Sequence, residues 1–183
     1  MEEKTYEFYG VDAKTELKIG IIVGVNTILT LFVLFLLFPT GNLRTNLFVI
    51  ALTLLWDSVV IKFFSKKNMR LWSLTKINDK LIIKYKEEMH EIPLKDIVQI
   101  NILGSIEHRY FTIKYNSQSV RIRVGTSWMA PFSRKGDLQI LDSFIKKLTN
   151  FLNKNFTKKD RKLSIAPKGT VKLTYTRKEK EIL

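Results

Sequence analysis

The chain has 183 residues, of which 31 are Lys or Arg and 17 are Asp or Glu, so its formal net charge is +14. It has two histidines and no cysteine, which excludes a disulfide scaffold, a thiolate metal site and catalysis built on several histidines. Hydrophobic residues make up an ordinary 45% of the chain, but they are concentrated in two runs near the N-terminus. This distribution excludes a simple soluble globule.

Two apolar runs predict a helical membrane hairpin over residues 19–64. Ile19–Phe38 contains no charged residue, and about 20 apolar residues in a helix cross a bilayer core. The second run, Leu47–Phe64, is broken by Asp57 and Lys62. A cleaved signal peptide is the weaker alternative, because residues 1–18 are net acidic and no small-residue cleavage site follows. Since the connection between the runs is short, we expect two antiparallel helices.

The orientation of this hairpin follows from the basic residues near its ends, because Lys and Arg favour the cytoplasmic side. Lys14 and Lys18 precede the first run, whereas the connecting loop carries Arg44 alone. Basic residues also follow the second run, at Lys62, Lys66, Lys67 and Arg70. We therefore expect a multi-pass protein of the inner (cytoplasmic) membrane with both termini in the cytoplasm. The part after Ile61, which holds 27 of the 31 basic residues, would lie on that side.

Two polar side chains interrupt the predicted hairpin. Asn26 and Asp57 lie at similar distances from the connecting loop, so a helical rise of about 1.5 Å per residue places them at similar depths. Polar groups in lipid seek partners, which permits a hydrogen bond between them. The sequence favours an alternative in which Asp57 pairs with Lys62 toward the cytoplasmic interface, because a proton or ion pathway needs more than one ionisable group. Gly20 and Gly24 form a G-x-x-x-G spacing that permits close helix approach.

The rest of the chain predicts a small β domain closed by a helix. Apolar and polar residues alternate, as in half-buried strands, over residues 70–77, 81–86, 97–103, 109–115 and 120–124. Asn78-Asp79 and Asn116-Ser117 are typical turn residues, and Pro93 indicates a strand start or an edge strand.

From Asp137 to Lys154 the apolar period changes to 3.6. The apolar stripe consists of Leu138, Leu141, Phe144, Ile145, Leu148, Phe151 and Leu152. This pattern predicts an amphipathic helix that packs on the strands, with Asp137 placed to cap its start.

Meandering strands followed by one C-terminal helix is the order of a pleckstrin-homology (PH) barrel. Residues 70–156 resemble the bacterial PH-like domains that often follow a two-helix membrane anchor, and Glu91–Ile100 is similar to the I-P-L-x-x-I-x-x-I pattern of those families. The resemblance implies an α+β cytoplasmic domain over residues 69–156, an antiparallel β-barrel capped by the C-terminal helix. Because such a barrel has more strands than the five segments above, one or two further strands are expected within Ile92–Leu103.

Residues 157–183 form a separate basic tail. Val171, Leu173 and Tyr175 alternate with polar residues, so a short strand and a disordered basic extension both remain open.

The motifs of catalysis and cofactor binding are not found in the sequence. Neither a phosphate-binding glycine loop nor a histidine motif for metals is present, and His90 and His108 are expected in turns. We therefore expect no enzyme, no cofactor and no metal site, and PH-like families, as binding modules, imply no chemistry to carry over.

The main contact site is predicted in Ser127–Lys135, which joins the last clear strand to the helix. Large apolar and basic side chains stand together in this non-periodic stretch, at Trp128, Met129, Phe132, Arg134 and Lys135. They suit a protein partner or anionic lipid, or they plug the barrel end. Arg121 and Arg123 share one strand face and, with Lys66, Lys67 and Arg70, form either a basic surface toward anionic head groups or an ordinary solvated face.

Together these features predict a non-enzymatic membrane protein. Its basic PH-like module would act at the cytoplasmic membrane face as an accessory or scaffold subunit of a membrane complex. The expected partners are anionic membrane lipids and a protein. Nucleic acid is not expected, because no recognised motif for it is present, and homo-oligomers stay open. In the alternative, the hairpin itself is the working part, with Asn26 and Asp57 serving transport or ion coupling.

Overall fold

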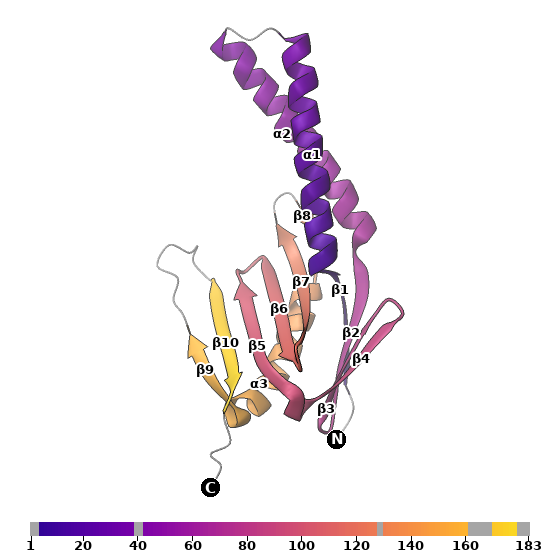
Figure 1. Cartoon of the computed structure of the whole chain (residues 1–183), viewed down its shortest axis with the longest axis vertical. Coiled ribbons are helices and arrows are strands. Elements are labelled where there is room, and N and C mark those ends of the chain that lie inside the picture. Colours follow the sequence, from indigo (N-terminus) through magenta and orange to yellow (C-terminus); the bar gives the residue numbers. More distant parts are fainter. Residues whose placement is uncertain (1–3, 39–41, 128–129, 161–169, 179–183) are drawn as a thin grey trace.

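The computed structural model describes residues 4–38, 42–127, 130–160 and 170–178. Its first strand, β1 (Thr5–Asp12), leads into two long helices, α1 (Ala13–Leu37) and α2 (Leu43–Asn68). Figure 1 shows these helices projecting from one end of a β domain. By length and composition, both helices are able to cross a membrane, and they extend beyond the two predicted runs at the end nearer the sheet.

Capping residues define where each long helix starts. Asp12 precedes α1 and accepts a hydrogen bond from the backbone N–H of Thr15 at 2.6 Å. Asn42 precedes α2 and accepts one from the N–H of Arg44 at 3.0 Å. Such side chains satisfy backbone donors that a helix leaves unpaired in its first turn.

The helical hairpin is inserted into a β-hairpin. Strand β1 pairs antiparallel with β2 (Arg70–Ile77), from Thr5 opposite Thr75 to Gly10 opposite Arg70. The last two residues of β1 pair instead with a different strand, in which Arg123 lies opposite Val11. No strand was predicted in residues 5–12. In the structure these residues form β1, which joins the two halves of the sheet.

Nine antiparallel strands follow one another through the sheet in the order β4-β3-β2-β1-β7-β6-β5-β10-β9. The strands not yet defined are β3 (Lys80–Tyr85), β4 (Glu88–Pro93), β5 (Ile97–Gly104), β6 (His108–Tyr115), β7 (Gln118–Ser127), β9 (Phe156–Asp160) and β10 (Val171–Arg177), and a short β8 (Ala130–Pro131) pairs with β7. Strands β4 and β9 end this path, and the described residues contain no pairing between them. The structure thus shows an open sheet rather than a closed barrel.

Most of the strands missing from the sequence analysis are not where they were expected. Residues 92–103 hold only the end of β4, a 3₁₀ turn at Leu94–Asp96 and most of β5. One additional strand, β4, thus ends in the expected range, and Pro93 lies in this edge strand as predicted. The others are the short β8 and three strands toward the ends of the chain, β1, β9 and β10. For the tail, the strand alternative is therefore the one found over Val171–Arg177.

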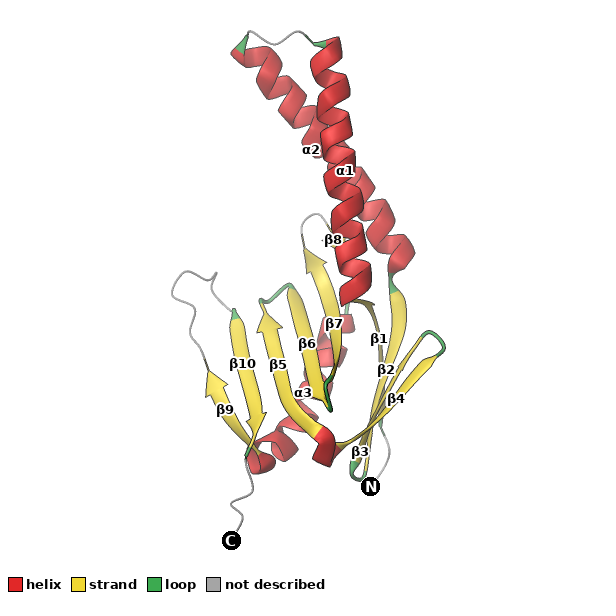
Figure 2. Ribbon diagram, in the orientation of Figure 1, coloured by secondary structure: helices red, strands yellow, loops and turns green. Residues whose placement is uncertain are grey.

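Helix α3 (Asp137–Asn155) lies across the strands and fills the core, as Figure 2 shows. Phe144 is 1% exposed and packs edge-on against the rings of Tyr6 and Phe111. This confirms the predicted packing of the apolar stripe. The capping prediction for Asp137 was wrong in detail: Gly136 is the cap, and the Asp137 carboxylate accepts a hydrogen bond from the N–H of Arg134 at 2.6 Å.

Gly10 stands where β1 passes from β2 to β7. A Cβ atom there would lie 2.9 Å from the carbonyl oxygen of Arg123 and 3.3 Å from atoms of Ile122 and Trp72. The close approach of the two halves of the sheet therefore requires a residue without a side chain.

Candidate functional site

The outer surface of the helical hairpin is apolar. Ile28 and Leu36 of α1 are 68% and 70% exposed, and Leu55 and Phe63 of α2 are 67% and 61% exposed. A soluble monomer rarely exposes a contiguous apolar surface of this kind. The two helices therefore need an apolar environment that the described part of the chain does not supply.

A polar cluster holds the middles of the two helices together. Asp57 is 7% exposed, and its carboxylate accepts hydrogen bonds from Asn26 Nδ2 and Thr27 Oγ1, each at 2.7 Å. Trp56 Nε1 donates to Asn26 Oδ1 at 3.2 Å. The hydrogen bond between Asn26 and Asp57 is thus present, whereas the favoured pairing of Asp57 with Lys62 is not among its described contacts. Thr27 and Trp56 were not predicted in this cluster, because the prediction rested on the two most polar side chains of the hairpin alone.

The base of α1 is bound to the outer face of the sheet. Glu16, in the first turn of α1, accepts hydrogen bonds from Arg123 Nη1 at 2.7 Å and Tyr110 Oη at 2.9 Å. Arg121 Nη2 lies 3.6 Å from the second carboxylate oxygen of Glu16. Arg121 and Arg123 do share one strand face, as predicted, but α1 covers part of it, so it is neither an open basic surface nor a fully solvated one.

Aromatic rings complete this junction. The guanidinium groups of Arg121 and Arg123 lie 4.5 and 5.2 Å from the ring centre of Tyr110, within the range of cation–π attraction. Burial raises the pKa of Tyr110, and its hydrogen bond to Glu16 raises it further. The Tyr110 hydroxyl therefore stays a donor to Glu16 at neutral pH.

A second tie joins the start of α1 to β3. Tyr85 Oη donates to Asp12 Oδ2 at 2.5 Å, so Asp12 both caps α1 and binds the sheet. Burial alone would raise the pKa of Asp12, but hydrogen bonds from Tyr85 and Thr15 and the charge of Lys86 bring it below its ordinary value. The carboxylate of Asp12 is therefore ionised at neutral pH.

The predicted contact segment lies partly outside the described residues. Nothing is described for Trp128 and Met129. Phe132 is 4% exposed and packs with Val11 and Ile19, so it is buried as in the alternative interpretation, but at the hairpin base rather than in the end of a barrel. It fills the base of the helical hairpin, where partly buried side chains surround the cluster, namely Val23, Ile61, Phe64 and Met69.

The basic residues of that segment remain at the surface. Arg134 and Lys135 are exposed, and the guanidinium of Arg134 lies 3.7 Å from the ring centre of Tyr9. These two side chains are therefore open to solvent, whereas that of Phe132 is not.

Lys66, Lys67 and Arg70 gather at the base of α2. The two lysines lie in its last turn, and all three side chains are exposed. Arg70 Nη1 donates to the carbonyl oxygens of Lys67 at 2.9 Å and Met69 at 3.1 Å. Positive groups at a helix C-terminus complement its dipole, so these residues have a local structural role and also place positive charge where the hairpin leaves the domain.

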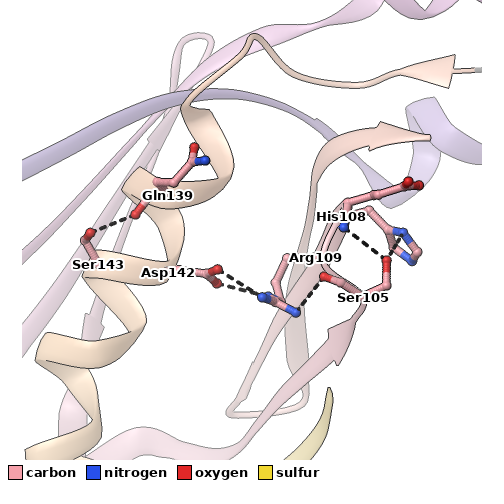
Figure 3. Close-up of polar contacts among 7 residues, drawn as sticks. Ser105, His108, Arg109, Gln139, Asp142 and Ser143 are labelled. Carbon is pink, nitrogen blue, oxygen red and sulfur yellow. Dashed lines mark hydrogen bonds and ion pairs between the residues drawn. The ribbon is translucent and has the colours of Figure 1, made fainter. Parts of the chain in front are cut away.

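The inner face of the sheet has its own charged contact, drawn in Figure 3. Arg109 Nε and Nη2 each donate to a carboxylate oxygen of Asp142 on α3 at 2.9 Å, and Arg109 Nη1 donates to the carbonyl of Ser105 at 3.0 Å. Asp142 lies outside the apolar stripe of the helix, and no local pattern in the sequence indicates its partner on β6. The bidentate pair fixes α3 against the strands.

The two histidines lie in strands, each beside a hydroxyl group. His90 lies within β4 rather than in the expected turn, with its Nδ1 3.1 Å from Tyr115 Oη. His108 begins β6, with its Nδ1 3.1 Å from Ser105 Oγ. Burial lowers the pKa of His108, and nearby Arg123 and Arg109 lower it further. Among the described residues, no group of three His, Cys, Asp or Glu residues is placed to hold a metal ion.

No protein-family model, curated protein or solved structure matches this chain. The resemblance to PH-like domains therefore rests on the order of its elements and on residues 91–100, and the open sheet does not itself support that assignment.

Proposed function

We propose that this chain is an integral membrane protein of the cytoplasmic membrane whose hairpin holds a non-enzymatic binding domain against the cytoplasmic face. In this role it serves as an accessory or scaffold subunit of a membrane complex. The observation that carries the proposal is the insertion of an exposed apolar hairpin between two paired strands, β1 and β2.

This connectivity fixes the domain relative to the membrane. Paired strands lie about 4.8 Å apart, so the bases of α1 and α2 are held side by side without a flexible linker. The hydrogen bonds of Glu16 to Arg123 and of Asp12 to Tyr85 add two further ties. The β3–β4 turn and the β5–β6 loop lie at the end of the sheet from which the hairpin projects (Figure 1). In the proposed placement, this end faces the bilayer.

The charges at this end support the cytoplasmic orientation. Exposed basic residues surround the base of the hairpin, at Lys14, Lys18, Lys66, Lys67 and Arg70. Each such residue near an anionic membrane surface contributes about 1 kcal/mol of attraction, and their position follows the excess of Lys and Arg on the cytoplasmic side of spans.

The domain also offers surface for a protein partner. Outside the helical hairpin, Met89, Val98 and Ile106 are large apolar residues that are 54%, 54% and 76% exposed. Strands β4 and β9 end the described sheet, and exposed strand edges and loops are surfaces on which binding modules contact other proteins. Met89 lies on β4, Val98 near the start of β5 and Ile106 in the β5–β6 loop, so a partner that covers all three would span several strands of the domain.

Extraction and affinity capture of the full chain test this proposal. The chain should resist alkaline carbonate extraction, and in mild detergent it should capture a specific membrane protein. Replacing Met89, Val98 and Ile106 by Ser should abolish that capture without lowering the melting temperature. Release of the chain by carbonate, or capture unchanged in the triple variant, would contradict the proposal.

A second candidate function is favoured by the buried Asp57 in the middle of the helix pair. Intramembrane carboxylates often mark ion or proton sites, and this one is held by Asn26 and Thr27. Asp57→Asn preserves the size of the side chain and removes the charge. A scaffold with this substitution still assembles its complex and keeps the activity of that complex, whereas loss of transport or ion coupling in an intact complex would establish the hairpin as the working part.

A further inference from the structure

We infer that the base of the hairpin holds one anionic phospholipid of the cytoplasmic leaflet, in a groove between the first turns of α1 and the outer face of β7. The inference depends on the membrane placement proposed above. A general attraction between basic residues and a membrane requires no specific site, whereas this inference assigns one lipid to one groove.

The groove has a charged end and an apolar end. Its lining residues are Ala13, Glu16, Leu17, Gly20, Ile21 and Arg121. The charged residues Glu16 and Arg121 stand at the end nearer the sheet, and Leu17, Gly20 and Ile21 continue into the apolar part of α1. A ligand that fits both ends has a charged head and an apolar tail.

The apolar end has room for an acyl chain. A Cβ atom built on Gly20 or Gly24 would meet no atom within 4 Å, so α2 does not pack against these glycines. Their neighbours Leu17 and Ile21 are 66% and 58% exposed. The two helices therefore do not contact each other through the G-x-x-x-G spacing, and the two glycines leave an open furrow along α1.

The charged end favours a phosphate group. Arg123 and Tyr110 make the short hydrogen bonds to Glu16, at 2.7 and 2.9 Å. Arg121 is further from Glu16, at 3.6 Å, and its side chain remains 44% exposed. One carboxylate facing two guanidinium groups leaves a net positive charge, and a guanidinium has five donors in a geometry that matches phosphate.

Further positive charge flanks the groove. Lys14 and Lys18 are exposed, and the helical period places them on the face of α1 next to Leu17 and Ile21. Arg121 is meanwhile held in place by the ring of Tyr110, 4.5 Å from its guanidinium. The ring fixes the orientation of the arginine, so less side-chain freedom is lost when it binds a head group.

Lipid retention by the purified full chain tests the inference. The protein in mild detergent is mixed with phosphatidylglycerol or phosphatidylcholine, and bound lipid is counted by native mass spectrometry. We expect one phosphatidylglycerol to be retained in preference to phosphatidylcholine. Arg121→Gln should weaken this binding about tenfold or more, as expected when a charge-assisted hydrogen bond is lost. Lys146→Gln, which removes one exposed charge on α3 at the opposite face of the sheet, should leave it unchanged.

A second variant tests the apolar end. Gly20→Leu extends a side chain into the furrow from a position where a Cβ atom meets no atom within 4 Å, so it should lower lipid retention and leave the melting temperature in detergent unchanged. Equal retention by all variants, equal binding of both lipids, or stabilisation by inorganic phosphate alone as strong as by phosphatidylglycerol would overturn the inference. A chain that is extracted by carbonate would instead refute the membrane placement itself, so the two failures are distinguishable.

Discussion

The junction between α1 and the sheet is the contact that most directly fixes the domain against the hairpin, and Glu16→Ala breaks it. Glu16 accepts two short hydrogen bonds, from Arg123 and Tyr110, and its side chain is 22% exposed. The substitution would leave the guanidinium of Arg123, only 15% exposed, without its carboxylate. Arg123 Nε is already without a described partner.

The expected loss is about 2–4 kcal/mol of unfolding free energy. Hydrogen bonds to charged groups contribute about 1.5–3 kcal/mol each, and removing one member of a buried pair costs about 3–5 kcal/mol. The upper value is reduced here because Arg121 stays near and the junction is partly solvated. Removing both partners in Glu16→Ala/Arg123→Ala should cost about 1–3 kcal/mol less than the sum of the single losses.

Urea unfolding of the full chain in mild detergent, followed by near-ultraviolet circular dichroism, gives these free energies. Glu7→Ala is the matched control, since Glu7 is an exposed carboxylate on β1, and it should change stability by less than about 0.5 kcal/mol. Losses in the single variants that add up in the double variant to within about 0.5 kcal/mol would refute the coupling and, with it, the rigid attachment.

Three further predictions follow from other parts of the fold. Phe144→Ala should cost about 3–5 kcal/mol in the same assay, because it empties a fully buried site in the core, whereas Ala at the exposed Gln139 should cost little. The pKa of His108 lies below its ordinary 6.5 in the folded chain, so the unfolded chain takes up the proton first as the pH falls, and stability should decrease just below pH 6.5. His108→Gln should remove that decrease, and His90→Gln should keep it. Finally, Ser117→Cys, in the exposed turn after β6, should react with a membrane-impermeant thiol reagent only in opened cells, and labelling of intact cells would reverse the orientation.

Elements encoded by consecutive residues were predictable. The segments 70–77, 81–86 and 109–115 alternate in polarity and are strands β2, β3 and β6 with small changes at their ends. The 3.6-residue period after Asp137 marks α3 because an amphipathic helix repeats its apolar face at that interval. The candidate site was predicted less well. Arg121 and Arg123 were correctly placed on one strand face, and burial of Phe132 was one of two alternatives. No contact was predicted for Glu16.

The sequence by itself determined that two helices are long and apolar enough to cross a membrane, since the length and composition of a run suffice for that. It also predicted the core helix and five of the ten described strands, namely β2, β3, β5, β6 and β7, because periodicity is a local property. Only the tertiary structure decided that residues 5–12 join the two halves of the sheet, that β9 and β10 extend it, and that Glu16 lies against Arg123. Each of these contacts joins residues far apart in the chain, and the energy of such pairing depends on the partner brought alongside, which no local pattern specifies.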